Sequence, residues 1–139
     1  MKTQSDLGKL IPHFKVFCNF LINHPRVIDK GRIAEYYCEL LFNLDLQPKI
    51  NDDFDAKDSR RKKIEIKQRD FASRVPPGMR IDLDKFDYLL YVSLGEDLLP
   101  DEILRFDSDD IEVNPKNKRA SFTSAFNSGK YRKIYARKG

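Results

Sequence analysis

The run FDYLLYVSL, from Phe86 to Leu94, is the feature that most constrains the fold of this chain. It is an almost unbroken series of apolar residues of strand length, rich in aromatic and branched side chains. Such a strand is buried on both faces, whereas a surface strand alternates between apolar and polar residues. The chain therefore needs a sheet that contains this strand and further elements that cover it.

The N-terminal residues show the three- and four-residue periodicity of amphipathic helices. One apolar stripe ends before His24-Pro25 and predicts an N-terminal helix. A second stripe predicts a helix from about Gly31 to Asn43, with Asp29 as its N-cap. The residues expected on its buried face are Ile33, Tyr37, Leu40, Leu41 and Leu44.

Beyond the second helix the period changes to two, which indicates strands. Pro76-Pro77-Gly78 marks a loop before the apolar strand, and the next strand is expected to pair with it. The other predicted elements are extended pieces at Leu46–Ile50 and Phe54–Lys57, strands at Lys62–Gln68 and Glu102–Phe106, a short helix at Ser121–Asn127 and a final extended or irregular piece at Lys130–Arg137.

With 139 residues and 40% apolar content, the chain has the size and composition of one α/β domain. We expect a central mixed sheet flanked by helices, with an extra N-terminal helix. Cys18 and Cys38 lie within apolar helical patterns without CxxC spacing, so they are expected to be buried and reduced. With no signal-peptide pattern or membrane span expected, the predicted location is cytoplasmic. The domain divides into an N-terminal helix at residues 1–28, a core at 29–106 and a basic C-terminal segment at 107–139.

Charge is segregated along the chain, although the formal net charge is only +4. Eight basic residues and no acid lie between Lys116 and the end, and basic residues also dominate from Lys57 to Lys85. The stretch from Asp87 to Glu112 is acidic. This pattern favours a protein that meets a polyanion on one side, and a solvated mixed surface is the alternative.

The residues Lys63-Ile64-Glu65-Ile66-Lys67 combine strand alternation with a chemical motif. Alternation directs the two isoleucines to one face, and it sends Glu65 and Lys67 to the other, side by side. Asp55 lies ten residues before Glu65, and a hairpin-like link through Asp58-Ser59-Arg60 brings the two carboxylates together. The alternative is that the charged pair is only the solvated side of a strand.

Two carboxylates beside an ammonium suit phosphodiester hydrolysis. Mg²⁺ prefers oxygen ligands and keeps several waters, so two carboxylates and a phosphate are a sufficient anchor. The metal polarises the phosphoryl oxygen and lowers the pKa of a bound water, while a lysine offsets the developing charge.

The order of these motifs resembles the PD-(D/E)XK nuclease superfamily, in particular its restriction-endonuclease-like branch, and shows some likeness to archaeal-type Holliday junction resolvases. The matching segments are GRIAEYYCELLF, FDAKD, IEIKQ and FDYLLYVSL, which would be the acid-bearing helix, the Asp strand, the (D/E)xK strand and a later apolar strand. Two features depart from the family pattern. Phe54 replaces the motif proline, and the residues between Arg69 and Asp87 do not predict the full helix found there in the family.

The resemblance implies a Mg²⁺-dependent endonuclease that acts on DNA, with Mn²⁺ as a substitute metal. Asp55, Glu65 and Lys67 would be the catalytic motif, with Glu35 as the helix acid. The metal ligands would be Asp55, Glu65, Glu35 and the backbone carbonyl of Ile66. Gln68 would contact the scissile phosphate. We expect no membrane partner, and a homodimer is compatible with this assignment. The basic residues expected to contact DNA are Arg60, Arg61, Lys62, Arg69, Arg74, Arg80, Lys130, Arg132 and Lys133.

Other functions fit parts of the pattern. A non-catalytic DNA-binding or assembly module could keep the same fold. An unrelated α/β protein could instead recruit a basic partner through the Asp87–Glu112 stretch. Glu35 alone is also consistent with a solvated helix acid beside Arg32. The basic tail, with Tyr131 and Tyr135, could stack on bases or be disordered.

Overall fold

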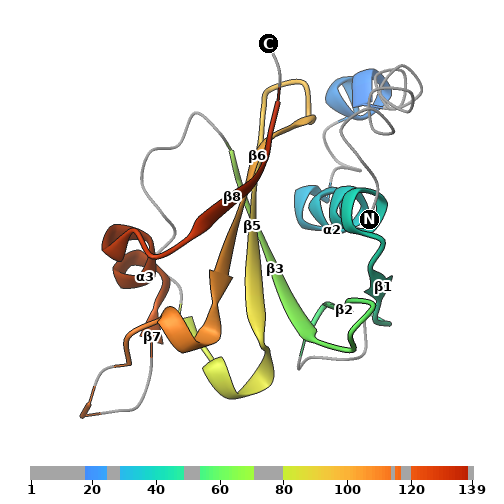
Figure 1. Ribbon diagram of the computed structural model, residues 1–139. Helices are drawn as coiled ribbons and strands as arrows, with labels where there is room; N and C mark the ends of the chain where they lie inside the picture. The colour runs from blue at the N-terminus through green and yellow to red at the C-terminus, as the bar shows by residue number, and fades with distance from the viewer. Residues whose placement is uncertain are drawn as a thin grey trace.

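The centre of the fold is a mixed sheet of six strands in the order β1-β2-β3-β5-β6-β8 (Figure 1). It is seen in a computed structural model that describes residues 18–24, 29–48, 54–70, 80–113, 115–116 and 120–137. Only β3 and β5 pair in parallel, and the other neighbours in this sheet are antiparallel. The strands are β1 (Asp45–Leu46), β2 (Ala56–Lys57), β3 (Lys63–Asp70), β5 (Tyr88–Leu94), β6 (Pro100–Asp107) and β8 (Arg132–Ala136).

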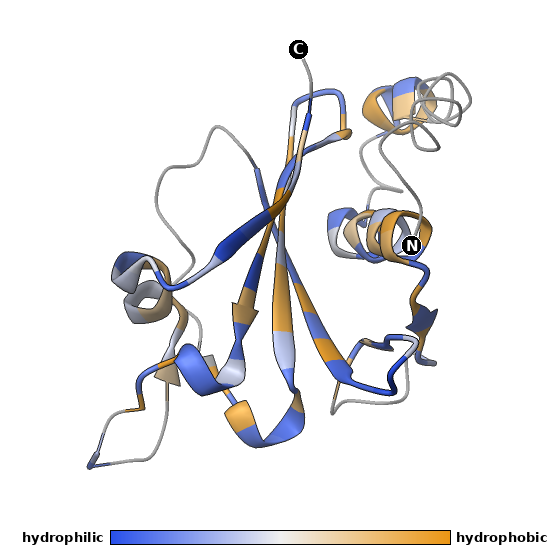
Figure 2. Ribbon diagram, viewed as in Figure 1, coloured by the Kyte–Doolittle hydropathy of each residue, from blue (hydrophilic) through white to orange (hydrophobic). Residues whose placement is uncertain are grey.

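The strand β5 occupies the interior of the sheet, as its apolar sequence predicts. Every residue from Tyr88 to Leu94 is buried. Parallel pairing aligns Ile64 of β3 with Tyr88 and Asp70 with Leu94, and β6 pairs antiparallel on the other side. In Figure 2 the central strands carry apolar colour, which alternates with hydrophilic colour along β3. The predicted pairing of the apolar strand with the next one is confirmed.

One face of the sheet is covered by α2 (Lys30–Phe42), which begins and ends close to its predicted limits. The predicted N-cap is confirmed, because Asp29 Oδ1 accepts a hydrogen bond from Arg32 N at 3.0 Å. The helix packs Tyr37, Cys38 and their neighbours against the isoleucines of β3. Leu40 is only partly buried, because the packed face is centred instead on Ala34, Tyr37, Cys38 and Leu41.

Residues 18–23 are helical and contribute buried Cys18 and Leu21 to the same core. His24 lies outside the helix, in agreement with the predicted end. The earlier part of that predicted helix is outside the described residues. Cys18 and Cys38 are free and buried, as expected.

The opposite face is covered by α3 (Phe122–Ser128) and a small sheet of β4 (Arg80–Ile81) and β7 (Ala120–Ser121) (Figure 1). Two short 3-10 helices lie at Leu83–Lys85 and Ser108–Asp110. An aromatic cluster fills this side and consists of Tyr91, Phe106, Phe122, Phe126 and Tyr131. The C-terminal segment therefore extends the expected core, since it supplies both α3 and the edge strand β8.

The connection from β3 to β5 is described from residue 80 onward, where it contains β4 and a 3-10 helix but no α-helix. The predicted loop at Pro76-Pro77-Gly78 is outside the described residues. None of the helices in the described part of the chain is long and apolar enough to cross a membrane.

Candidate active site

Asp55 lies at the edge of β3 where β2 begins. Its backbone N donates to Ile64 O at 2.9 Å, and its carboxylate Oδ2 accepts from Ile66 N at 2.7 Å. The N–H and C=O of a strand residue point to the same side of the strand, so the Ile66 carbonyl also faces this edge. The hairpin therefore brings Asp55 beside the (D/E)xK strand, as the sequence predicts.

Glu65 and Lys67 lie on the same face of β3. Ile64 and Ile66 are buried on the other face, so the predicted alternation is confirmed. The Lys67 ammonium is 3.4 Å from Glu65 Oε1. Burial and the adjacent Asp55 carboxyl raise the pKa of Glu65 to about 8, although Lys67 opposes the shift. In the metal-free protein, Glu65 therefore holds a proton near neutral pH.

Glu35 approaches Asp55 from α2. Its Oε2 is bound by Arg32 Nη1 at 2.7 Å, one turn earlier on the helix. Burial raises the pKa of Glu35, the hydrogen bond from Arg32 opposes this, and the nearby Asp55 carboxylate adds to the increase. Asp55 thus interacts with an acid from α2 and with one from β3. Its position at the sheet edge allows both contacts.

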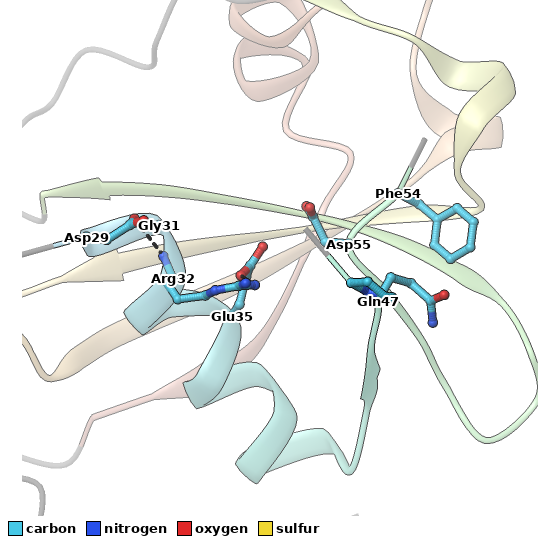
Figure 3. A pocket seen from close by; sticks show the side chains of 8 residues that line it. Asp29, Gly31, Arg32, Glu35, Gln47, Phe54 and Asp55 are labelled. Atoms are coloured by element: carbon cyan, nitrogen blue, oxygen red, sulfur yellow. Dashed lines mark hydrogen bonds and ion pairs between the residues drawn. The ribbon is translucent and has the colours of Figure 1, made fainter. Parts of the chain in front are cut away.

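A pocket of about 210 Å³ opens beside Asp55. Glu35 and Asp55 stand on facing walls, with their carboxylates directed toward the space between the helix and the strand edge (Figure 3). Of the motif residues Asp55, Glu65 and Lys67, Asp55 lines this pocket and the other two do not. The lining residues are Asp29, Gly31, Arg32, Glu35, Gln47, Pro48, Phe54 and Asp55.

Gln68 is not part of this constellation. Strand alternation places it on the face opposite Glu65 and Lys67, and its amide donates to Asp70 Oδ1 at 3.3 Å. Asp70 also pairs with Lys30 of α2 at 2.9 Å. The expected phosphate contact of Gln68 therefore has no support in its position.

The oxygen donors at this edge fit a hard divalent cation. The described residues contain no group of three or more His, Cys, Asp and Glu side chains that could hold a metal ion. Asp55 nevertheless lies beside Glu65, and the Ile66 carbonyl faces the same edge of the strand. Mg²⁺ needs only one or two carboxylates when water and phosphate complete its shell. A divalent cation would also balance two neighbouring acids. The donor set suits Mg²⁺ or Mn²⁺ and lacks the sulfur and nitrogen ligands of a structural zinc site.

The basic residues expected to contact DNA are placed very differently from one another. Arg60, Arg61 and Lys62 are exposed in the turn between β2 and β3. Arg69 departs from the expectation, because its side chain is only 11% exposed and bonds to Ser93 and Glu102. Its guanidinium also stacks over Tyr91 and Phe126. Arg69 therefore has a structural role.

The remaining candidates lie in the C-terminal half or in the β3–β5 connection. The ammonium or guanidinium groups of Lys130, Arg132 and Lys133 are within 4 Å of Glu112, Asp107 and Glu102, respectively. Arg80 belongs to β4, and Arg74 is outside the described residues. The C-terminal piece is a strand with internal ion pairs and not a disordered basic arm.

Sequence reasoning missed the pair formed by Lys57 and Lys63, which face each other across β2 and β3. The signal was present in the alternation of the two strands, but the register of the hairpin was needed to use it.

Comparison with protein families and with curated proteins finds no matching family model and no matching protein.

Proposed function

We propose that this protein is a metal-dependent endonuclease that hydrolyses DNA phosphodiester bonds at the Asp55 edge of β3, with a core like that of PD-(D/E)XK nucleases. The observation that carries the proposal is the position of Asp55, which contacts both Ile66 N and the Glu65 carboxyl. The Lys67 ammonium lies 3.4 Å from Glu65 Oε1. The spacing in the sequence would allow this arrangement, and the fold produces it.

The order of elements supports the same proposal. An acid-bearing helix, α2, precedes the antiparallel strands β1, β2 and β3, and the apolar strand β5 lies next to β3 in parallel. The resemblance requires this series of helix, Asp strand, (D/E)xK strand and apolar strand. The described residues between β3 and β5 contain no α-helix, and α3 covers the face of the sheet opposite α2.

Asp55, Glu65 and the Ile66 carbonyl would hold Mg²⁺, or Mn²⁺ in its place. When bound there, the metal would polarise a phosphoryl oxygen and lower the pKa of a bound water.

The side chains have separate tasks. Lys67 places a positive charge beside the carboxylate pair, where it offsets negative charge that develops on the phosphate. Arg32 donates to Oε2 of Glu35 and so holds this carboxylate in the pocket beside Asp55. The hydrogen bond from Ile66 N fixes the Asp55 carboxylate against the strand.

The test is a cleavage assay on plasmid, linear, single-stranded and branched DNA with Mg²⁺, Mn²⁺ or chelator. The wild type should cleave only with metal, and Asp55→Asn and Lys67→Met should each lose on the order of 10³-fold in rate. Asn keeps an oxygen for the Ile66 N–H, so the fold is preserved. Asp70→Asn is the matched control, because Asp70 is an exposed acid on β3, the strand that carries Lys67. This variant should cleave as the wild type does.

Equal activity in the wild type and both variants would show that the site is assigned wrongly. A folded wild type that binds DNA but does not cleave any of the four substrates with either metal would favour the non-catalytic module.

A further inference from the structure

Lys57 and Lys63 face each other directly across β2 and β3. Like charges at opposed positions of an antiparallel pair are destabilising, by up to roughly 1 kcal/mol. Two lysines in this position reduce the stability of a hairpin that is already short. Such a pair needs compensation, either from within the protein or from a ligand.

Among the residues that the structure describes, the compensation does not come from a carboxylate. Asp45 is the strand partner of Lys57 on β1, but in the described part of the chain neither lysine has an ion pair. Both ammonium groups lie instead 5.5 Å from the centre of the Phe54 ring. An aromatic face offsets part of their repulsion, and it leaves both positive charges available to an anion.

The turn that follows β2 adds three more cations, Arg60, Arg61 and Lys62, all exposed. Asp58 holds this turn in shape, because its Oδ1 accepts from Arg60 N and Lys62 N, each at 2.9 Å. Its Oδ2 accepts from the Tyr88 hydroxyl at 2.9 Å, which anchors the turn to the sheet. The one carboxylate in the turn is therefore engaged by these donors, and it forms no ion pair with the cations.

The lysine pair lies beside the carboxylate pair. On β3, Lys63, Glu65 and Lys67 project from the same face at steps of about 7 Å, so Glu65 has a cation on either side. Lys57 faces Lys63 from β2, and Asp55 immediately precedes that strand. An anion bound by the two lysines would be a close neighbour of a phosphate held at Asp55.

We propose that Lys57 and Lys63, with Arg60, Arg61 and Lys62, form a cationic hairpin that binds backbone phosphates of double-stranded DNA next to the scissile one. This inference rests on the proposed function and names the substrate class. Proteins that hold single strands use exposed aromatic faces on which bases stack. Phe54 is only 8% exposed, so the hairpin offers phosphate contacts without a stacking platform.

The experiment measures binding of the double variant Lys57→Gln/Lys63→Gln to a short fluorescent duplex by anisotropy. Chelator is present throughout, so the duplex remains intact. The matched control is Lys130→Gln/Arg132→Gln, which removes the same charge from exposed residues of the C-terminal part. The hairpin variant should weaken binding at least about tenfold at low salt and lower the salt slope by about 1.8, since each phosphate contact contributes about 0.9. The control should bind within about twofold of the wild type.

Thermal melts keep the test independent of folding, because removal of a like-charge pair should leave the melting temperature equal to or above that of the wild type. Equal losses in the two double variants would overturn the inference. Equally tight binding of the matching single strand, with the same dependence on the two lysines, would overturn the duplex assignment. Hairpin-dependent duplex binding by a protein that never cleaves would uphold this inference while the proposed function fails. Cleavage by the wild type, together with an unchanged salt slope in the hairpin variant, would uphold the proposed function while this inference fails.

Discussion

The β2–β3 hairpin and the C-terminal strand β8 carry similar runs of basic residues, but the fold uses these charges differently. In and next to β8, Arg132, Lys133 and Arg137 each lie within 3.4 Å of a carboxylate. In the hairpin, the lysines contact a phenyl ring and the turn residues are exposed. One run is neutralised within the protein, and the other remains available to a partner.

The difference arises from the neighbouring strand. β8 pairs antiparallel with β6, which belongs to the acidic stretch between Asp87 and Glu112. Segments of opposite charge that are separate in the sequence are thereby brought together, so the expected segregated field is largely cancelled there. The pairing of β6 with β8 also engages acids of the Asp87–Glu112 stretch, which the sequence alone would leave for a basic partner. A run of charge indicates a binding surface only when its strand neighbours do not neutralise it.

Arg69→Met should show the largest effect, and it tests whether an arginine from the basic region can be purely structural. Loss of one partner from a largely buried ion pair costs about 3 kcal/mol, and the substitution also removes the stacking over Tyr91 and Phe126. Urea denaturation should show this decrease in the free energy of unfolding. Under conditions where the variant is folded, its affinity for duplex DNA should match that of the wild type.

An Arg69 variant of normal stability with weakened DNA binding would contradict this contrast between exposed and internally paired basic residues. It would place Arg69 with the hairpin and not with the internally paired residues.

Arg61→Gly should have a smaller effect, and it should raise the stability of the protein while it weakens DNA binding. Arg61 has a φ of 66°, a left-handed conformation that glycine adopts without strain, so the change should raise the free energy of unfolding by about 0.5–1 kcal/mol. Loss of the cation should lower the salt slope of DNA binding by about 0.9.

Arg60→Gly is the matched control for the neighbouring position, since Arg60 is not among the residues with positive φ. It should lower both the stability and the slope. A lower stability for Arg61→Gly as well would show that the left-handed residue stores no strain in the turn.

Much of the fold can be predicted because local patterns determine it. The apolar run of β5, the stripe and N-cap of α2, and the alternation in β3 each depend on residues close together in the chain. The role of β8 could not be predicted in this way, because its partner β6 is distant in sequence and only the paired sheet shows which charges meet. Arg69 belongs to the same class, since its partners Ser93 and Glu102 come from β5 and β6.

The candidate site follows the same rule. Asp55, Glu65 and Lys67 are linked by one hairpin, so alternation and a short connection are sufficient to bring them together. The resemblance implies a phosphate contact for Gln68, but the alternation of the same strand places it on the other face. The facing lysines required the register of β2 and β3, because a shift of one residue would move one of them to the opposite face.

The most direct test of the central claim is calorimetric titration of the metal-free protein with Mg²⁺, in two buffers of different ionisation enthalpy. Glu65 has a pKa of about 8 without metal, and a carboxylate must lose its proton to bind a cation. Metal binding should therefore release close to one proton at about pH 7, release little at about pH 9, and weaken as the pH falls below 8. Glu65→Gln should abolish the proton release, and Asp55→Asn should abolish the binding. Metal binding that releases no proton and is unchanged in Asp55→Asn would contradict a metal site at the Asp55 edge.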